Sequence, residues 1–281
     1  MSKKAAQDHS RDLDQFYTNP EYAQQFYSKI ESLIDLSSVD IILEPSAGNG
    51  SFFNLMDLSK RVGIDVDPKA PSIIKQDFFD YMPPSGKQII TVGNPPFGKN
   101  SNLAIKFFNR AAIFSDVIAF ILPRTFRKDS VINRLDKYFH LLYEEIVPDN
   151  SFIFNDNAYD VWCCAQIWIR KNELRPKIEI KSFKQVEEYF VIVEPEDADF
   201  SIQRVGGKAG HIRTNDFKSY SKQSHYFIKQ KDTRSLDIFK QIDFDEVKKN
   251  TAGNPSVSPS ELVKLWLEAA ASFNIMSNED I

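Results

Sequence analysis

The chain has 281 residues, of which 42% are hydrophobic, with a formal net charge of −4 and a sequence pI of about 5.7. This length can bury a sizeable core, and it allows one large domain or a catalytic domain with a smaller appendage. The acidic balance argues against a uniformly basic nucleic-acid-binding surface, although it leaves room for a local basic patch.

Features that would indicate a membrane, secreted or metal protein are missing from the sequence. No apolar run approaches the ~20 residues of a membrane span, and no signal-peptide pattern opens the chain, so a cytoplasmic protein without membrane contact is expected. The polar stretch 1–15 predicts a flexible tail. Cys163 and Cys164 are adjacent, which favours buried thiols in a reducing compartment over a disulfide. The four histidines lack metal-ligand spacing, so no metal is expected.

Apolar runs alternate with helix-like segments through roughly the first 170 residues, which predicts an α/β fold with a mostly parallel sheet. The predicted strands are Ile41–Glu44, Val62–Asp65, Ile73–Gln76, Gln88–Val92, Val117–Leu122, Leu141–Val147 and Val161–Ile169. The predicted helices are Tyr22–Leu36, Phe52–Leu58, Asn102–Phe114 and Ser130–Tyr138. The last two strands are close enough in sequence to form an antiparallel pair at the sheet edge.

The charged segment Lys171–Pro176 predicts a boundary between a domain at 16–172 and a C-terminal region at 173–281. Ser258 and Glu261 form a capping-box pattern with Pro259 at the first helical position, which predicts a final helix to about Ala271. Between these points, residues 200–231 carry seven Lys or Arg against one acidic residue. The basic residues are Arg204, Lys208, Arg213, Lys218, Lys222, Lys229 and Lys231, and the interleaved aromatic residues are Phe200, Phe217, Tyr220, Tyr226 and Phe227.

The first predicted strand is followed by the glycine-rich segment Glu44-Pro-Ser-Ala-Gly-Asn-Gly50. Glycine lets the backbone turn sharply and approach a ligand closely. The segment lacks the third glycine of the dinucleotide-binding fingerprint, and no Lys-Ser/Thr pair follows as in a phosphate-binding loop. A phosphate group is therefore not the obvious ligand.

Acidic residues stand at the ends of three successive predicted strands: Glu44, Asp65 and Asp77. Asp65 can accept hydrogen bonds from a ribose diol, and Asp77 can accept one from an adenine amino group, with Phe78 on the purine face. Any one of these acids alone is better explained as a helix cap or a solvated loop residue. Three together favour a bound ligand, because ligands bind at the carboxyl ends of parallel strands.

Asn94-Pro-Pro-Phe97 follows the predicted strand that ends at Val92. The Asn94 side-chain oxygen and the Pro95 carbonyl can each accept a hydrogen bond from one planar amino group, and the two prolines restrict the backbone nearby. Phe97 would stack on the ring that carries the amine, with core packing as its alternative role. This arrangement suits methylation of an amide or aromatic amine nitrogen, such as N6 of adenine.

With these motifs, the chain resembles the class I S-adenosylmethionine-dependent methyltransferases that carry an Asn-Pro-Pro-Phe/Tyr motif, over roughly Phe16 to Arg170. Phe16-Tyr-Thr-Asn-Pro20 resembles their N-terminal motif, Gly63–Asp67 their ribose motif and Gln76–Phe78 their adenine motif. The motif order, with a recognition region last, is similar to the γ group of adenine-N6 DNA methyltransferases. Thr18 and Glu21 also fit a capping box that starts the first helix.

The resemblance implies a Rossmann-like sheet of seven strands, S-adenosylmethionine as cofactor, and nucleic acid as partner. The implied catalytic residues are Asn94, Pro95, Pro96 and Phe97. The implied cofactor-binding residues are Phe16, Tyr17, Thr18, Glu44, Pro45, Ala47, Gly48, Gly50, Asp65, Val66, Asp77, Phe78 and Asn94. An aromatic residue closing the other face of the base would be Phe152 or Phe154, with core packing as the alternative for each.

The basic segment, with its interleaved aromatics, resembles a nucleic-acid-binding surface and supplies candidate phosphate contacts, Arg204, Lys208 and Arg213, with a solvated basic face as the alternative. The implied reaction is methyl transfer to adenine N6 in DNA, on a base flipped out of the duplex. The alternatives are adenine in RNA, glutamine N5 in a protein, and an inactive nucleic-acid-binding module. The sequence leaves open the target site, the strandedness, a paired restriction nuclease and the oligomeric state, with a monomer favoured.

Overall fold

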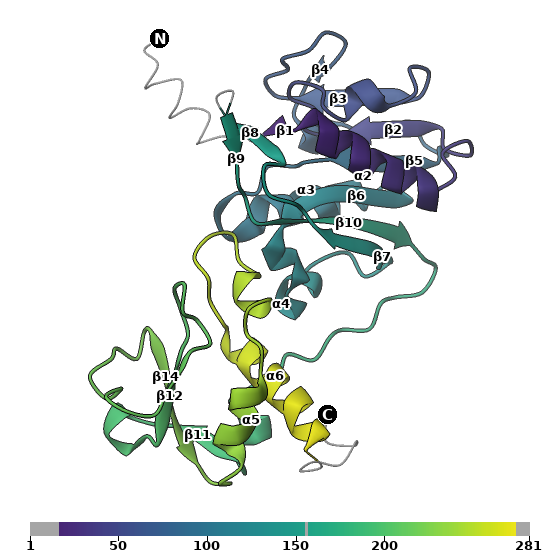
Figure 1. Cartoon of the computed structure of the whole chain (residues 1–281). Coiled ribbons are helices and arrows are strands. Elements are labelled where there is room, and N and C mark those ends of the chain that lie inside the picture. The colour runs from purple at the N-terminus through teal and green to yellow at the C-terminus, as the bar shows by residue number, and fades with distance from the viewer. Residues whose placement is uncertain (1–16, 155–156, 274–281) are drawn as a thin grey trace. The chain divides into compact units, whose positions relative to one another are not determined.

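The computed structural model describes residues 17–154 and 157–273, so the predicted tail and Phe16 lie outside the described residues. The chain divides into two compact units between Ile178 and Glu179 (Figure 1). The segment after residue 172 stays with the first unit, because Arg175 donates hydrogen bonds to the carbonyls of Phe139 and Ile132 at 3.1 and 2.9 Å.

The first unit is built on a seven-stranded sheet in the order β4-β3-β2-β5-β6-β10-β7. Strands β2 to β6 pair in parallel, while β10 runs antiparallel to both β6 and β7. This confirms the predicted Rossmann-like, mostly parallel α/β sheet and its antiparallel edge pair. The strands are β2 (Ile41–Glu44), β3 (Arg61–Asp65), β4 (Ile74–Lys75), β5 (Ile89–Gly93), β6 (Val117–Pro123), β7 (Phe139–Ile146) and β10 (Cys163–Arg170).

Apolar clusters cover both faces of this sheet. Ile42 packs in one cluster with residues of α2 (Pro20–Leu33), while Leu43 packs in the other with residues of α3 (Asn102–Ala111). Neighbouring residues on a strand point to opposite faces, so an uninterrupted apolar run serves both clusters at once. This is why the buried strands β5 and β6 appear in the sequence as continuous apolar segments rather than alternating ones.

Two predicted helices are much shorter in the structure. The Phe52–Leu58 prediction contains only the 3₁₀ turn Phe53–Leu55, and the Ser130–Tyr138 prediction contains only α4 (Asp129–Ile132). Beyond each segment a side chain bonds to the local backbone: Asp57 accepts from the Ser59 amide, and Asp136 accepts from the Tyr138 amide, each at 2.8 Å. Such bonds offer the backbone an alternative to a helix.

The cap of α2 also differs from the prediction. Asn19, not Thr18, caps this helix, and its side chain accepts from the Glu21 amide at 2.9 Å. Thr18 belongs instead to β1 (Tyr17–Thr18), which pairs with β8 (Phe152–Phe154), and β8 pairs with β9 (Asn157–Tyr159). This small sheet joins the N-terminal motif to a hairpin that precedes β10.

The second unit has a four-stranded antiparallel sheet in the order β11-β14-β12-β13. Its strands are β11 (Phe190–Ile192), β12 (Phe200–Gln203), β13 (Ile212–Arg213) and β14 (His225–Gln230). One face packs against α5 (Ser235–Gln241) and α6 (Pro259–Ser272), which together enclose an apolar core. Helix α6 begins with the predicted capping box of Ser258 and Glu261.

The aromatic residues of the basic segment are mostly core residues of this second unit. Phe200, Phe217, Tyr226 and Phe227 are buried, and Tyr220 is exposed. Of the five interleaved aromatic residues, Tyr220 alone is exposed enough for the base stacking that the sequence allowed as an interpretation.

Candidate functional site

A cavity of about 330 Å³ lies at the carboxyl ends of β2, β3 and β5, a size within the range of small-molecule sites. Strands β3 and β4 lie on one side of β2, and β5 and β6 lie on the other, so the sheet order reverses here. Open α/β sheets bind ligands at such a reversal point. The predicted site residues that line the cavity are Tyr17, Thr18, Glu44, Pro45, Ala47, Gly48, Asp65, Val66, Asp77, Phe78, Asn94 and Pro96.

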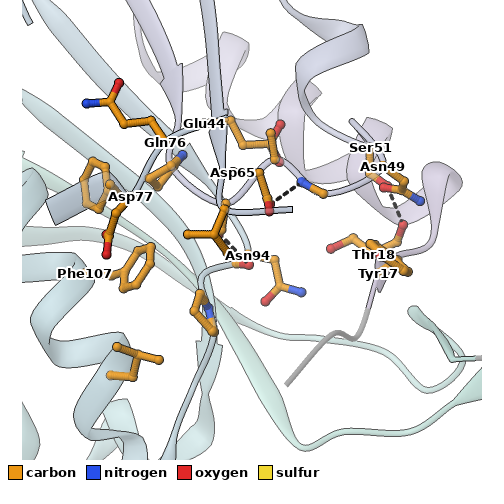
Figure 2. A pocket seen from close by; sticks show the side chains of 18 of the residues that line it. Tyr17, Thr18, Glu44, Asn49, Ser51, Asp65, Gln76, Asp77, Asn94 and Phe107 are labelled. Atoms are coloured by element: carbon orange, nitrogen blue, oxygen red, sulfur yellow. Dashed lines mark hydrogen bonds between the residues drawn. The ribbon is translucent and has the colours of Figure 1, made fainter. Parts of the chain in front are cut away.

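The polar side chains of the cavity separate into three groups along its length (Figure 2). Gln76 and Asp77 lie at one end together with Phe107. Tyr17, Thr18, Asn49 and Ser51 lie at the other end, and Glu44, Asp65 and Asn94 stand between the two ends. An elongated ligand with different chemical groups at its two ends suits this arrangement.

The middle group is organised by the glycine-rich segment. Gly48 has a φ of 49°, and a Cβ atom placed there would lie 2.9 Å from the Tyr17 ring. Its amide donates to Asp65 Oδ2 at 2.7 Å, while the Asp67 amide donates to Oδ1 at 2.7 Å. Each Asp65 oxygen is thus fixed by one backbone amide and keeps capacity to accept from a ligand. Gly50 does not line the cavity; its amide closes the turn on Ala47 at 2.6 Å.

The aromatic end combines a cap with a cluster of rings. Asp77 accepts from the Phe79 amide at 2.9 Å and caps the 3₁₀ turn Phe78–Asp80, so the capping role and the cavity-lining position coexist. Phe78 is buried and its ring stacks on Phe107, with centroids 5.2 Å apart. Phe79 meets Phe107 edge-on at 5.1 Å. Phe107 and Phe79 complete an apolar slot beside Asp77.

The opposite end is held by β1. The Ser51 hydroxyl oxygen lies 2.8 Å from the Thr18 carbonyl oxygen and 2.9 Å from Asn49 Oδ1. Thr18 is itself buried, and it contacts Ser51 through its backbone carbonyl rather than its side chain. The site prediction omitted eight residues that line the cavity: Ser46, Asn49, Ser51, Gln76, Phe79, Gly98, Leu103 and Phe107. The spacing of Leu103 and Phe107, four residues apart on α3 just after the tetrapeptide, was the available signal.

The tetrapeptide divides between the cavity and the core. Asn94 and Pro96 line the cavity, while Pro95 is buried and Phe97 packs against both apolar clusters of the sheet. Core contact is therefore present at Phe97, as its alternative role supposed. Gly93 precedes them with a φ of 151°, and a Cβ atom there would lie 3.2 Å from Glu44. The close approach of β5 to β2 at this point requires glycine.

The two aromatic candidates for the second face of the base have different outcomes. Phe152 is 1% exposed and belongs to an apolar core cluster, which favours its core-packing alternative. Phe154 lies in β8, but its side chain is outside the described part of the structure.

The loop after the tetrapeptide holds a strained backbone. Gly98, Asn100 and Ser101 have φ values of 64°, 55° and 61°, in the left-handed region. Ser101 is buried, and its hydroxyl lies 2.6 Å from the Thr125 hydroxyl. Left-handed non-glycine residues cost free energy and cluster at functional sites. Here they bring Gly98 and Leu103 into the cavity wall.

Glu44 is the most perturbed ionisable group of the cavity. Burial raises the pKa of its carboxyl well above the usual range, and the charge of Asp65 adds to this, while the hydrogen bond from the Phe53 amide, at 2.7 Å, opposes it. A cationic ligand group beside this carboxyl would favour its ionised form. Glu44 is thus suited to hold a positively charged part of a ligand.

The raised pKa of Glu44 predicts that its ionised carboxylate, although suited to bind a cation, lowers the stability of the ligand-free protein. A raised folded-state pKa means that Glu44 contributes its full stability below the unfolded-state pKa, and that this contribution is lost as the pH rises through the folded-state pKa. Glu44→Gln cannot ionise, so the ligand-free variant should unfold at a higher temperature than wild type at about pH 8, by at least a few degrees. Thermal unfolding between about pH 5 and 8 measures this. A variant less stable than wild type at the alkaline end would contradict it.

The three basic candidates of the second unit are not all alike. Lys208 is exposed, the Arg204 guanidinium lies 5.3 Å from the Tyr226 ring centre, and the Arg213 guanidinium lies 4.8 Å from the Tyr220 ring centre. Tyr220 stacks on His225. His225 and Tyr226 are neighbours in β14, so their side chains point to opposite faces of the sheet. Arg204 therefore lies over a side chain on one face of β14, while Arg213 lies over Tyr220, which covers His225 on the other face. Among the other lysines, Lys222 and Lys229 form ion pairs with Glu194 and Asp199.

No protein-family model matches the chain, and no curated protein matches it. Solved structures with a similar arrangement include a proposed RNA methyltransferase from Pyrococcus horikoshii, at 17% identity and a TM-score of 0.45, covering 56% of this chain and 87% of that one. A proposed class I S-adenosylmethionine-dependent methyltransferase from Listeria monocytogenes shows 14% identity and a TM-score of 0.44, over 58% of this chain and 64% of that one.

The 23S rRNA methyltransferase ErmE shows 13% identity and a TM-score of 0.42, over 91% of this chain and 99% of that one. At such identities and TM-scores, none of these similarities carries an argument about activity. Within residues 17–154 and 157–273, no helix is long and apolar enough to cross a membrane. The same residues contain no group of three His, Cys, Asp or Glu side chains placed to hold a metal ion.

Proposed function

We propose that this chain transfers a methyl group from S-adenosylmethionine to the exocyclic N6 of adenine in nucleic acid, with DNA as the favoured substrate. The observation that carries the proposal is that Asn94 lines the same cavity as Asp65 and Asp77. A residue suited to hold an amine and residues suited to hold a nucleoside thus share one site.

The cavity residues fit the proposed cofactor group by group. Asp65, fixed by two backbone amides, would accept hydrogen bonds from the ribose diol. Asp77 would accept one from the adenine amino group, with the ring in the slot formed by Phe79 and Phe107. The polar end at Thr18, Asn49 and Ser51 would take the amino-acid part, and Glu44 would favour its positive charge. When bound, the cofactor supplies an electrophilic methyl group.

Asn94 and Pro95 would act on the target amine. The adenine N6 lone pair is delocalised into the ring, which makes this nitrogen a poor nucleophile. Two acceptors, the Asn94 side-chain oxygen and the Pro95 carbonyl, would draw N6 toward tetrahedral geometry and localise the lone pair. Positioning and partial negative charge near a developing cation supply the acceleration. Asn94 is not a base, so the N6 proton would leave after transfer.

The second unit would supply the contacts to the polymer. Arg204, Lys208 and Arg213 are the candidate phosphate contacts, and a duplex adenine would have to be flipped out to reach Asn94. The alternative substrate is adenine in RNA, because Asn94 and Pro95 would contact only the amino group and not the sugar.

A methyl-transfer assay with labelled S-adenosylmethionine on unmodified DNA, RNA and protein tests the proposal. The expected product is N6-methyladenine in DNA, identified by mass spectrometry of the nucleosides. If N6-methyladenine is found only in RNA, the substrate is RNA and not DNA. Methylglutamine in protein would overturn the nucleic-acid assignment, and failure to bind S-adenosylmethionine in calorimetry would overturn the proposal as a whole.

A further inference from the structure

The second face of the small sheet, away from α5 and α6, carries polar side chains beside Phe227, which packs with Ala198 and Phe217 in a small apolar cluster. Ser201 on β12 pairs directly with Arg213 on β13, and His225 on β14 pairs with Gln203, two residues along β12 from Ser201. Side chains directly opposite across strands, or two apart on one strand, share a face. Ser201, Arg213 and His225 are therefore grouped on that face, while the alternate residues Phe200 and Ile202 pack in the core.

Each of these three residues has a buried polar atom without a hydrogen-bond partner in the described part of the chain. These atoms are Ser201 Oγ, Arg213 Nε and His225 Nε2. Ser201 is 0% exposed and His225 is 5% exposed. Buried polar atoms are nearly always paired in folded proteins, and each exception requires an explanation. Three exceptions on one face of one small sheet point to a shared ligand.

The hydrogen bonds around His225 define what its ring can do. The Ser224 hydroxyl donates to the Ser221 carbonyl at 2.9 Å, so toward His225 Nδ1, also at 2.9 Å, it acts as an acceptor. Nδ1 therefore carries the proton in the neutral ring, and Nε2 is a bare acceptor. Protonation of the ring would convert Nε2 into a donor.

The surroundings of His225 are cationic. Burial, followed by the charges of Arg213 and His211, lowers the pKa of His225 below its ordinary value of 6.5. The Tyr220 ring stacks on the His225 ring with centroids 4.5 Å apart. The Arg213 guanidinium in turn lies 4.8 Å from the centre of the Tyr220 ring. Among the residues that the structure describes, no carboxylate contributes to this shift, so an anion would supply the opposite charge.

We propose that Ser201, Arg213 and His225 form a binding site for one backbone phosphate of the nucleic-acid substrate, with Tyr220 as its cover. This inference rests on the proposed function, because it takes nucleic acid as the substrate. Arg213 and the Ser201 hydroxyl donate to the phosphate oxygens, and His225 takes a proton from solvent and donates from Nε2. The Tyr220 ring moves aside to admit the phosphate, and its face becomes available to stack on a neighbouring base.

Binding by the full-length protein to a labelled oligothymidylate of about 12 nucleotides tests this site, because that ligand carries phosphates but no adenine. Arg213→Gln should weaken binding at least about fivefold and reduce the slope of log affinity against log salt by about 0.7, the value of one phosphate on a single strand. Ser201→Ala should weaken it less. Arg234→Gln is the matched control, because this exposed arginine pairs with Asp232 in the same unit. Equal losses in Arg213→Gln and Arg234→Gln would overturn the proposal.

A second measurement is made on the wild-type protein, with a variant needed only to assign one signal. The chain has four histidines, so imidazole signals can be followed by NMR through a pH titration, with His225→Gln used for assignment. Oligothymidylate should raise the pKa of His225, and its affinity should fall as the pH rises between the free and bound pKa values. An unchanged His225 titration would overturn the site. If inorganic phosphate raises this pKa equally, and displaces oligothymidylate at equal phosphate concentration, the ligand of the site is free phosphate and not the polymer.

These results separate the two proposals. Methyl transfer to adenine with an unchanged His225 titration would overturn the phosphate site alone. A raised His225 pKa without any methyl transfer would leave the phosphate site supported and overturn the proposed reaction alone.

Discussion

Asn94→Ala is expected to lower methyl transfer at least about 100-fold while S-adenosylmethionine affinity stays within a few-fold of wild type. The substitution removes a hydrogen-bond acceptor from the target amine, and it leaves Asp65 and Asp77 in place. Single-turnover assays with labelled cofactor measure the transfer step, and calorimetry measures binding. Because the truncated residue lies in the cavity wall, the effect should fall on the rate of transfer rather than on folding.

Asn54→Ala is the matched control for this prediction. Asn54 is exposed and does not line the cavity, so its truncation should leave both transfer and binding near wild type. Turnover of Asn94→Ala close to that of Asn54→Ala would eliminate the proposed mechanism.

Asp65→Ala should weaken S-adenosylmethionine binding at least about 50-fold, because hydrogen bonds to a charged group contribute about 1.5–3 kcal/mol each and a diol would make two of them. The change should also lower the unfolding temperature by a few degrees, since the amides of Gly48 and Asp67 lose their shared acceptor. Calorimetry and thermal unfolding of the ligand-free protein measure the two effects separately.

Asp67→Ala provides the comparison at the next acidic position. Asp67 pairs with Lys69 and does not line the cavity, so the variant should bind S-adenosylmethionine within a few-fold of wild type. If the two variants lose affinity equally, Asp65 has no specific role toward the ligand and the assignment of the ribose position is wrong.

Strands β2, β3 and β5 were predictable from sequence because each apolar run ends in a glycine or an acidic residue. Ile41–Glu44 was predicted with its observed bounds, and the strand that ends in Asp65 differs by one residue at its start. Short helical segments were not predictable in the same way. At Phe52–Leu58 the spacing is helical, but Asp57 bonds to the Ser59 amide and turns the chain.

The cavity was predictable where the sequence places a polar or glycine residue directly after a strand. Glu44, Asp65 and Asn94 are of this kind, and all three line the cavity. Residues brought in from a helix face or a turn were missed, since Phe107 looks like an ordinary core residue of α3 until α3 is placed beside Asp77 (Figure 2). The basic residues of 200–231 are close together in sequence, but the structure separates two of them: Arg204 lies over Tyr226 of β14, and Arg213 lies over Tyr220, which covers the other face of that strand.

The small sheet of β1, β8 and β9 has a thermodynamic consequence. Tyr17 and Thr18 form part of the cavity wall, and their strand is hydrogen-bonded to a hairpin more than 130 positions later in the chain, where Thr18 pairs with Phe152 and the Asn19 amide donates to the Ser151 carbonyl. A ligand that stabilises β1 must therefore also stabilise that hairpin. A macromolecule that stabilises the hairpin must likewise stabilise β1. Free-energy coupling between two binding events is reciprocal, so each ligand would change the affinity for the other by the same factor.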